Sequence, residues 1–166
     1  MQKAAVSDLQ ILPYASAYRK AFRDLNHEWI RQYFELEEAD NKMLNDPEGY
    51  ILDKGGFIFL ALLNGEAVGT VALLKNPDNS FELAKMAVTP KAKGLKIGYA
   101  LGIAALEKAR EEKAAKVELL SNRKLAPALN LYFKLGFREV PLPPTDYQRC
   151  DIKMELHFGP DQVPVD

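Results

Sequence analysis

The feature that most constrains this sequence is a strand, a basic loop and a helix start in direct succession over residues 82–102. An apolar run ends at Pro90, a turn containing Gly94 follows, and an alanine-rich segment begins near Ile97. The first amides of a helix have no partner inside it and carry the positive end of the helix dipole. The stretch therefore predicts an anion-binding turn. Three lysines add positive charge around it: Lys91, Lys93 and Lys96.

Length, charge and cysteine content restrict the class of protein. The chain has 166 residues, a formal net charge of −1 and one cysteine, Cys150. The length suits a single domain, and the near-neutral charge gives no reason to expect nucleic acid as a partner. His27 and His157 lie too far apart in the sequence to suggest a metal site. The lone cysteine, and the lack of an apolar run of about 20 residues, favour a cytoplasmic monomer or homodimer without a membrane partner.

Hydrophobic periodicity predicts one mixed α/β domain over residues 1–166, with a frayed tail over residues 159–166. Expected helices cover residues 16–35, 37–44, 97–112 and 125–135. Expected strands cover residues 3–12, 57–63, 67–74, 81–88, 116–121, 137–140 and 150–158. The Asn64-Gly65 turn predicts a hairpin, so we expect a mostly antiparallel sheet. Residues 81–121 add one parallel, right-handed βαβ unit, with helices on both faces of the sheet.

A second motif follows the basic loop: Ala128-x-x-Leu131-Tyr132-x-Lys134-x-Gly136-Phe137. The loop itself lacks the glycine spacing of a Walker or a Rossmann motif. Together, loop and second motif resemble the GNAT acetyltransferase superfamily over residues 57–158. The core motif of that superfamily is arginine or glutamine, two residues, glycine, one residue, then glycine or alanine. Lys93 stands at the first position and Lys96 at the first glycine, whereas Gly98 matches.

The resemblance implies a GNAT-like fold and acetyl-CoA as the donor, with its pyrophosphate at the basic loop and no metal. The main chain of the preceding strand would run beside the pantetheine arm. Two interpretations of position 96 stay open. If cofactor binding needs only a main-chain amide in a helical conformation at this position, Lys96 is compatible with it. If the pyrophosphate needs the space that glycine leaves, Lys96 would weaken cofactor binding. The implied cofactor-binding residues are Met86, Ala87, Val88, Lys93, Gly94, Leu95, Lys96, Ile97, Gly98 and Tyr99.

Tyr132 and Glu82 are the candidate catalytic residues. Acyl transfer to an amine needs a base for the ammonium and benefits from an acid for the departing thiolate. The resemblance implies Tyr132 as the acid, although its apolar helix face also suits a core tyrosine. Strand alternation places Glu82 on one face with Ala84, Met86 and Val88, where its pKa would rise. Some family members carry a general-base glutamate at this spacing, and the alternative is a strand-end glutamate facing solvent.

Three further residues are candidates for binding the acceptor. Asn122 follows a predicted strand, where its side chain would contact a substrate or cap the next helix. Trp29 and Tyr33 lie on the first helix, which lines the acceptor site in this superfamily; the alternative is that both belong to the core. Acidic residues near them would suit a cationic amine, and the alternative is that most of them are solvated. These are Glu28, Glu35, Glu37 and Glu38.

The resulting hypothesis is an N-acetyltransferase that moves an acetyl group from acetyl-CoA to a primary amine by direct attack in a ternary complex. The expected acceptor is a small or amino-acid-like molecule. A protein or peptide acceptor is one alternative, and a non-catalytic acyl-CoA-binding or sensing module is another. Nucleic-acid binding through the loop lysines is disfavoured by the near-neutral charge. Cys150 and both histidines are expected to be structural.

Overall fold

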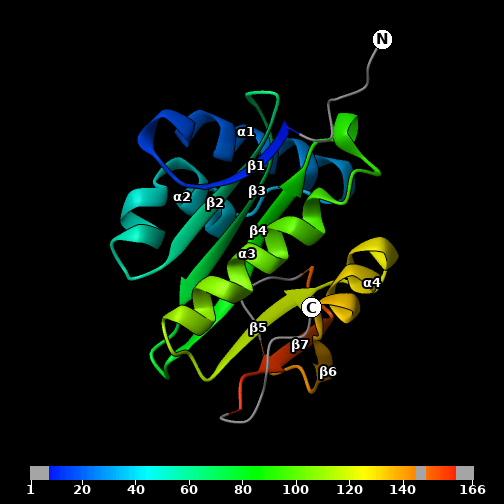
Figure 1. The fold of residues 1–166 in the computed structure, drawn as a ribbon. Helices are drawn as coiled ribbons and strands as arrows, with labels where there is room; N and C mark the ends of the chain where they lie inside the picture. Colours follow the sequence, from blue (N-terminus) through cyan, green and yellow to red (C-terminus); the bar gives the residue numbers. More distant parts are fainter. Residues whose placement is uncertain (1–7, 145–148, 160–166) are drawn as a thin grey trace.

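A computed structural model describes residues 8–144 and 149–159, which form a seven-stranded sheet covered by helices on both faces (Figure 1). The strands are β1 (Leu9–Pro13), β2 (Phe57–Leu63), β3 (Glu66–Lys75), β4 (Ser80–Val88), β5 (Lys116–Ser121), β6 (Arg138–Val140) and β7 (Ile152–His157). The α-helices are α1 (Arg19–Tyr33), α2 (Glu38–Asn45), α3 (Ile97–Glu111) and α4 (Ala126–Leu135). The strand order is β1-β2-β3-β4-β5-β7-β6.

The sheet divides the core into two apolar clusters. On one face, α3 packs its alanine-rich side against β3, β4 and β5, and Leu101 and Ala105 are fully buried there. On the other face, α1 packs on β3 and β4 through Phe22 and Ile30, and Leu44 of α2 joins the same cluster. Figure 1 shows α3 in front of the sheet and α1 and α2 behind it. This confirms the expected mixed sheet with helices on both faces.

The parallel pair β4 and β5 opens the sheet. Every other neighbouring pair is antiparallel, whereas β4 and β5 run parallel and pair only from Ser80 to Glu82. Beyond Glu82 the two strands diverge, and in Figure 1 both arrowheads point to the upper right. Among residues 8–144 and 149–159, the β5-facing edge of β4 therefore has no strand partner after Glu82, where the pairing with β5 stops.

A β-bulge at Lys85 interrupts β4 and overturns one expectation from the sequence. Lys85 has a left-handed φ of 55°, and the register against β3 shifts so that Ala72 pairs with Ala84 but Thr70 pairs with Ala87. The extra residue reverses the alternation. Met86 and Val88 consequently pack with the α3-side cluster, whereas Ala87 faces α1. The prediction that Glu82, Ala84, Met86 and Val88 share one face is therefore wrong beyond Ala84.

The element bounds otherwise follow the expectations with three differences. Pro13 lies inside β1 rather than after it, which an edge strand tolerates because its outer amide needs no partner. A single π-helical turn over Glu48–Leu52, where the sequence indicated only a helix end, leads into β2. The last strand, β7, inserts between β5 and β6. The proposed strand start at residues 3–7 and the tail from residue 160 lie outside the described residues.

Within residues 8–144 and 149–159, none of the helices combines the length and apolarity needed to cross a membrane. The same residues contain no group of three or more His, Cys, Asp or Glu side chains arranged to hold a metal ion.

Candidate active site

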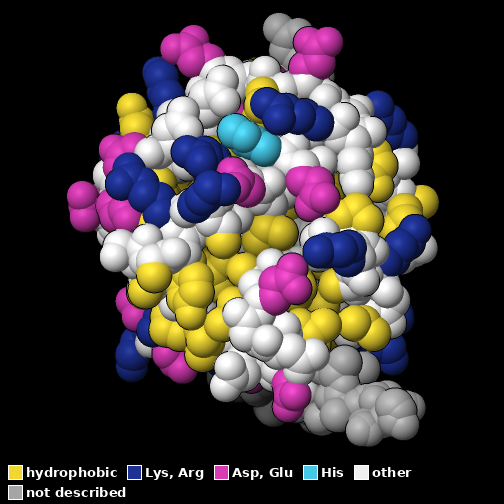
Figure 2. Space-filling model, turned by 90° about the horizontal axis from the view of Figure 1, so that it is seen from above, with side chains coloured by type: hydrophobic (Ala, Val, Ile, Leu, Met, Phe, Trp, Pro, Cys, Tyr) yellow, Lys and Arg dark blue, Asp and Glu magenta, His cyan; other side chains and the backbone are white. Residues whose placement is uncertain are grey.

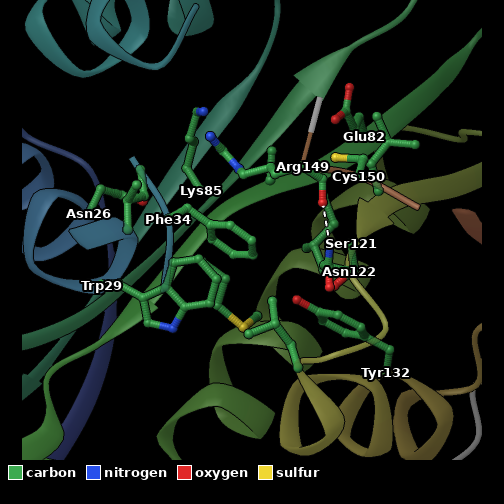
Figure 3. Close-up of a pocket in the computed structure, with 16 residues that line it drawn as sticks. Asn26, Trp29, Phe34, Glu82, Lys85, Ser121, Asn122, Tyr132, Arg149 and Cys150 are labelled. Atoms are coloured by element: carbon green, nitrogen blue, oxygen red, sulfur yellow. Dashed lines mark hydrogen bonds between the residues drawn. The ribbon is translucent and has the colours of Figure 1, made fainter. Parts of the chain in front are cut away.

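Two cavities lie where β4 and β5 separate. The first, the inner cavity, has a volume of about 100 Å³ and is enclosed by α1, β4, β5, α4 and the segment before β7. Figure 3 shows side chains converging on it from these elements. Its lining includes Trp29, Glu82, Lys85, Asn122, Tyr132 and Arg149.

The second cavity, the loop cavity, has a volume of about 790 Å³ and lies outside the N-terminus of α3. The loop before α3 forms one wall and α4 forms the other. Val88 and Leu131 line this cavity, and the nearby Met86 and Tyr132 line the inner cavity. The two cavities therefore lie side by side along β4 and α4. Figure 2 views this end of the molecule and shows hydrophobic side chains gathered in the middle with charged ones around them.

The loop turns sharply through two left-handed residues. Gly94 has a φ of 86°, and Lys96, directly before α3, has a φ of 60° and a ψ of 29°. A methyl group added at Gly94 would meet nothing within 4 Å, so the main chain there is open to a ligand. At Gly98 the added carbon would lie 3.1 Å from Leu131, so this glycine allows α3 to approach α4 closely. Position 96 thus requires a left-handed conformation, which glycine adopts without strain and lysine does not.

The start of α3 supplies main-chain donors to the loop cavity. Ile97, Gly98 and Tyr99 form its first turn and line the cavity, and amides in that position have no acceptor inside the helix. Lys93 and Lys96 are exposed beside them. The positive end of the helix dipole and two ammonium groups therefore surround one open space, which suits a phosphate-bearing ligand.

Tyr132 brings its hydroxyl to the inner cavity, on the side near the loop cavity. It lies on α4, and its ring packs edge-on against Phe137 with 6.2 Å between centroids. Figure 3 shows its oxygen pointing toward the centre of the inner cavity. Burial raises the pKa of Tyr132 to about 12, so the hydroxyl keeps its proton at neutral pH.

Glu82 is the last residue of β4 that pairs with β5, and its partner across the ladder is Glu118. Burial, followed by the negative charge of Glu118, raises the pKa of Glu82 to about 7. The positive charges of Lys85 and Lys153 oppose that shift. Near neutral pH, Glu82 is therefore present in both the protonated and the ionised form.

A buried ion cluster forms another wall of the inner cavity. Asp40 of α2 is fully buried and accepts hydrogen bonds from Arg149 Nη1 and Nη2, both at 2.8 Å, and from Lys85 Nζ at 2.7 Å. Glu37 accepts a further bond from Arg149 at 3.2 Å. Burial alone would raise the pKa of Asp40, but the hydrogen bonds and charges of Arg149 and Lys85 hold it well below its usual value.

The family model described as acetyltransferase (GNAT) family matches residues 17–137. The chain belongs to this family. The match covers α1 through α4 and thus most of both cavities. The resemblance seen in the loop and the Leu131-Tyr132 motif is confirmed.

Two named relatives align with parts of this GNAT domain. N-acetylaspartate synthetase from Homo sapiens is 36% identical over 113 residues, which are 67% of this chain and 37% of that protein. Aminoalkylphosphonate N-acetyltransferase from Salmonella typhimurium is 34% identical over 94 residues, 54% of this chain and 61% of that protein. The chain therefore spans less than two thirds of the length of both relatives.

Solved structures of GNAT proteins have the same fold. A GNAT-family acetyltransferase from Staphylococcus aureus superimposes with a TM-score of 0.81 at 24% identity, covering 90% of this chain and 98% of that one. A putative acetyltransferase from Salmonella typhimurium, solved with its cofactor acetyl-CoA, superimposes with a TM-score of 0.73 at 18% identity. That likeness covers 95% of this chain and 98% of the other. The expected GNAT-like fold is confirmed.

Seven of the ten residues predicted to bind the cofactor line the loop cavity, and three do not. Met86 lines the inner cavity, Ala87 is buried beneath α1, and the Leu95 amide donates to the Ala92 carbonyl at 3.4 Å. The sequence missed the contribution of α4, from which Asn130 and Lys134 face the loop. The other predicted residues come together around the loop cavity: Val88, Lys93, Gly94, Lys96, Ile97, Gly98 and Tyr99.

The three predicted acceptor residues have different surroundings. Trp29 lines the inner cavity, whereas Tyr33 is 46% exposed and packs its ring on Trp29 with 5.3 Å between centroids. Asn122 also lines the cavity, but it does not cap α4. Its Nδ2 donates to the Arg149 carbonyl at 2.6 Å, and its Oδ1 accepts from the Lys124 amide at 2.9 Å. Asn122 therefore fixes the segment that carries Arg149.

Sequence reasoning missed Lys85 and Arg149 as parts of the site and assigned Cys150 only a structural role, although all three line the inner cavity. Lys85 had one visible signal, because it is the only charged residue in the otherwise apolar run from Leu83 to Val88. Arg149 had none: it precedes the last strand and reaches the cavity only through the fold. Burial raises the pKa of Cys150, so its thiol stays protonated.

Proposed function

We propose that this chain transfers an acetyl group from acetyl-CoA to the primary amine of a small, amino-acid-like acceptor. The main supporting observation is that the loop cavity and the inner cavity lie side by side along β4 and α4, with Tyr132 on the inner one. A wall suited to phosphate groups therefore lies beside a smaller cavity lined by Tyr132 and Glu82. The inner cavity, at about 100 Å³, suits a small acceptor. The names of the two relatives, which refer to aspartate and aminoalkylphosphonate, support an acceptor of this kind.

The residues present fit acetyl-CoA in two respects. The amides at the start of α3, together with Lys93 and Lys96, match the charge of a pyrophosphate. The open edge of β4 beyond Glu82 offers main-chain groups to the two amides of a pantetheine arm, as an added strand would use them. Acetyl-CoA, when bound, supplies the thioester that the acceptor amine attacks.

The protein's part in the chemistry is proton transfer. The Glu82 carboxylate would accept a proton from the acceptor ammonium and leave a nucleophilic amine. The Tyr132 hydroxyl would donate its proton to the departing sulfur and be restored by exchange with solvent. Their raised pKa values support these opposite roles, because Tyr132 holds its proton while Glu82 exchanges one near neutral pH. Location in the cytoplasm and a monomeric or homodimeric state remain predictions from the sequence.

Release of free thiol from acetyl-CoA in the presence of a panel of small amines tests the proposal. We expect thiol release that depends on both protein and amine. Tyr132→Phe should lower kcat roughly 100-fold while the Kd for CoA, measured by calorimetry, stays within about twofold. Phe133→Leu on the exposed side of α4 is the matched control and should leave both values unchanged. Tight binding of CoA without thiol release would instead favour a non-catalytic acyl-CoA-binding module.

A further inference from the structure

Lysine side chains without a partner gather at the loop cavity. Within residues 8–144 and 149–159, every lysine side chain but four pairs with a carboxylate, a carbonyl oxygen or an aromatic ring, as Lys91 does with Glu66. The lysines without such a partner are Lys93, Lys96, Lys113 and Lys134. All of them except Lys113 line the loop cavity. Their ammonium groups are therefore available to a ligand bound there.

The three lysines come from both walls of the loop cavity. Lys93 and Lys96 belong to the loop before α3, whereas Lys134 belongs to the last turn of α4. Leu131 lies one turn earlier on α4, and a Cβ added at Gly98 would lie 3.1 Å from its side chain. The two walls therefore approach each other closely near the start of α3. A ligand bound to that helix start would contact α4 as well.

The loop cavity has no negative charge to compensate these lysines. No Asp or Glu is among the described residues that line it. The positive end of the α3 dipole adds to the charge of the three ammonium groups. The electrostatic potential in the cavity is therefore positive, and it favours a ligand with several negative charges.

Acetyl-CoA has an anionic group besides its pyrophosphate. The ribose carries a phosphate monoester at its 3′ position, and such a group has a charge of about −1.5 to −2 at pH 7. The start of α3, with Lys93 and Lys96, already supplies positive charge for the pyrophosphate. Lys134 is a further cation on the opposite wall, and the monoester is the cofactor's remaining phosphate.

We propose that Lys134 binds the 3′-phosphate of CoA, so that the protein distinguishes CoA from 3′-dephospho-CoA. This inference rests on the proposed function only in that CoA is the ligand of the loop cavity. A lysine binds a phosphate as a compact point charge, which suits a monoester that rotates about its ester bond. Lys134 would determine cofactor specificity and take no part in acetyl transfer, because Tyr132 and Glu82 line the other cavity.

Calorimetric titration of the protein with CoA and with 3′-dephospho-CoA tests the proposal. We expect the wild-type chain to bind CoA about 10-fold more tightly, as one charge-assisted hydrogen bond at an exposed site would produce. Lys134→Gln should raise the Kd for CoA about 10-fold and change the Kd for 3′-dephospho-CoA less than about twofold. Equal affinities of the wild-type chain for the two ligands would overturn the proposal.

Other lysine substitutions separate this role from a general effect of charge. Lys93→Gln should raise the Kd for both ligands by a similar factor, because both carry the pyrophosphate. Lys108→Gln is the control: Lys108 lies on α3 outside the loop cavity, where it pairs with Glu111, and its loss should change neither Kd. Lys134→Arg keeps the charge and should keep the preference for CoA. An equal loss of affinity for both ligands in Lys134→Gln would contradict the assignment. Since Lys134 is exposed, the substitution should leave the Tm of the free protein unchanged.

Turnover separates this inference from the proposed reaction. Lys134→Gln should raise KM for acetyl-CoA about 10-fold and leave kcat within about twofold of the wild-type value. If the chain prefers CoA to 3′-dephospho-CoA but never releases thiol, the proposed reaction fails and the role of Lys134 stands. If thiol is released with equal kcat/KM from acetyl-CoA and from its 3′-dephospho form, the reaction stands and the role of Lys134 fails. If neither ligand binds, both fail.

Discussion

The loop cavity is walled mainly by one continuous segment around the start of α3, whereas the inner cavity is walled by side chains from five separate segments. On the proposed function, the first would bind its ligand through main-chain amides and exposed lysines, so its chemistry would tolerate changes of side chain. The second depends on buried charges whose positions are fixed by hydrogen bonds across the fold. A common ligand can be held by shared backbone geometry, but discrimination among acceptors needs particular side chains.

From this comparison we expect the buried charges beside the inner cavity to contribute more to the free energy of unfolding than the residues of the loop cavity do. Asp40→Asn should lower the free energy of unfolding by about 3–5 kcal/mol, because Lys85 and Arg149 would lose their buried counter-charge. Urea denaturation measures this loss. Since the pKa of Asp40 is lowered by folding, its contribution should be complete above a pH of about 4 and decline in acid.

Asp24→Asn is the matched control for that substitution. Asp24 pairs with Lys20 on the exposed side of α1, and its loss should cost less than about 1 kcal/mol. If the two variants lose similar free energy of unfolding, the buried cluster contributes no more to stability than an exposed ion pair does.

A second effect concerns the pH dependence of the reaction. Because the proposed base must be ionised, and the pKa of Glu82 is raised to about 7, kcat/KM should rise with pH through that region. Glu82→Gln should lower the rate roughly 100-fold at pH 8 and abolish this rise. A profile for the variant that rises as the wild type does would exclude Glu82 as the titrating group.

Glu118 provides a smaller and more selective change. Its charge raises the pKa of Glu82, so Glu118→Gln should move the rise in kcat/KM to lower pH. Glu155→Gln is the control, since Glu155 pairs with the neighbouring Lys116 and Lys153 but does not contribute to the shift of Glu82. A profile shifted equally by both variants would indicate a general effect of surface charge.

The smallest expected effect tests the loop. Lys96→Gly should stabilise the chain by about 1 kcal/mol, or about 2–4 °C in Tm, because glycine relieves the left-handed strain at this position. Lys96→Ala removes the same charge and keeps the strain, so calorimetry should find it no more stable than the wild type. Equal stability of the two variants would mean that the conformation carries no cost.

The same contrast explains which parts of the molecule the sequence predicts. Strands, helices and the loop cavity follow from local patterns, as at Asn64-Gly65, Gly94 and the helix start at Ile97, because each depends on neighbours along the chain. Four of the catalytic and acceptor-site candidates from the sequence line the inner cavity: Glu82, Asn122, Trp29 and Tyr132, the last two through the family resemblance.

Its charged wall could not be predicted, for two physical reasons. The bulge at Lys85 shifts the strand register by one residue, and strand alternation cannot reveal an extra residue. Arg149 and Asp40 are 109 positions apart, so their contact arises only when α2 and the segment before β7 come together. The acidic wall expected from the glutamates of the first helices is in part a counter-charge, since Glu37 bonds Arg149.

The three-residue ladder between β4 and β5 also has a mechanical consequence. It is the sole strand pairing between a four-stranded half, β1 to β4, and a three-stranded half, β5 to β7, in the described part of the sheet. A ligand bound along the open edge of β4 would contact both halves of the sheet and limit their relative motion. Amide hydrogen exchange in the second half of β4 would then slow when the ligand is bound, and so measure how much of the protein carries it. The ligand would stabilise the sheet as an added strand does, and its release would remove that stabilisation.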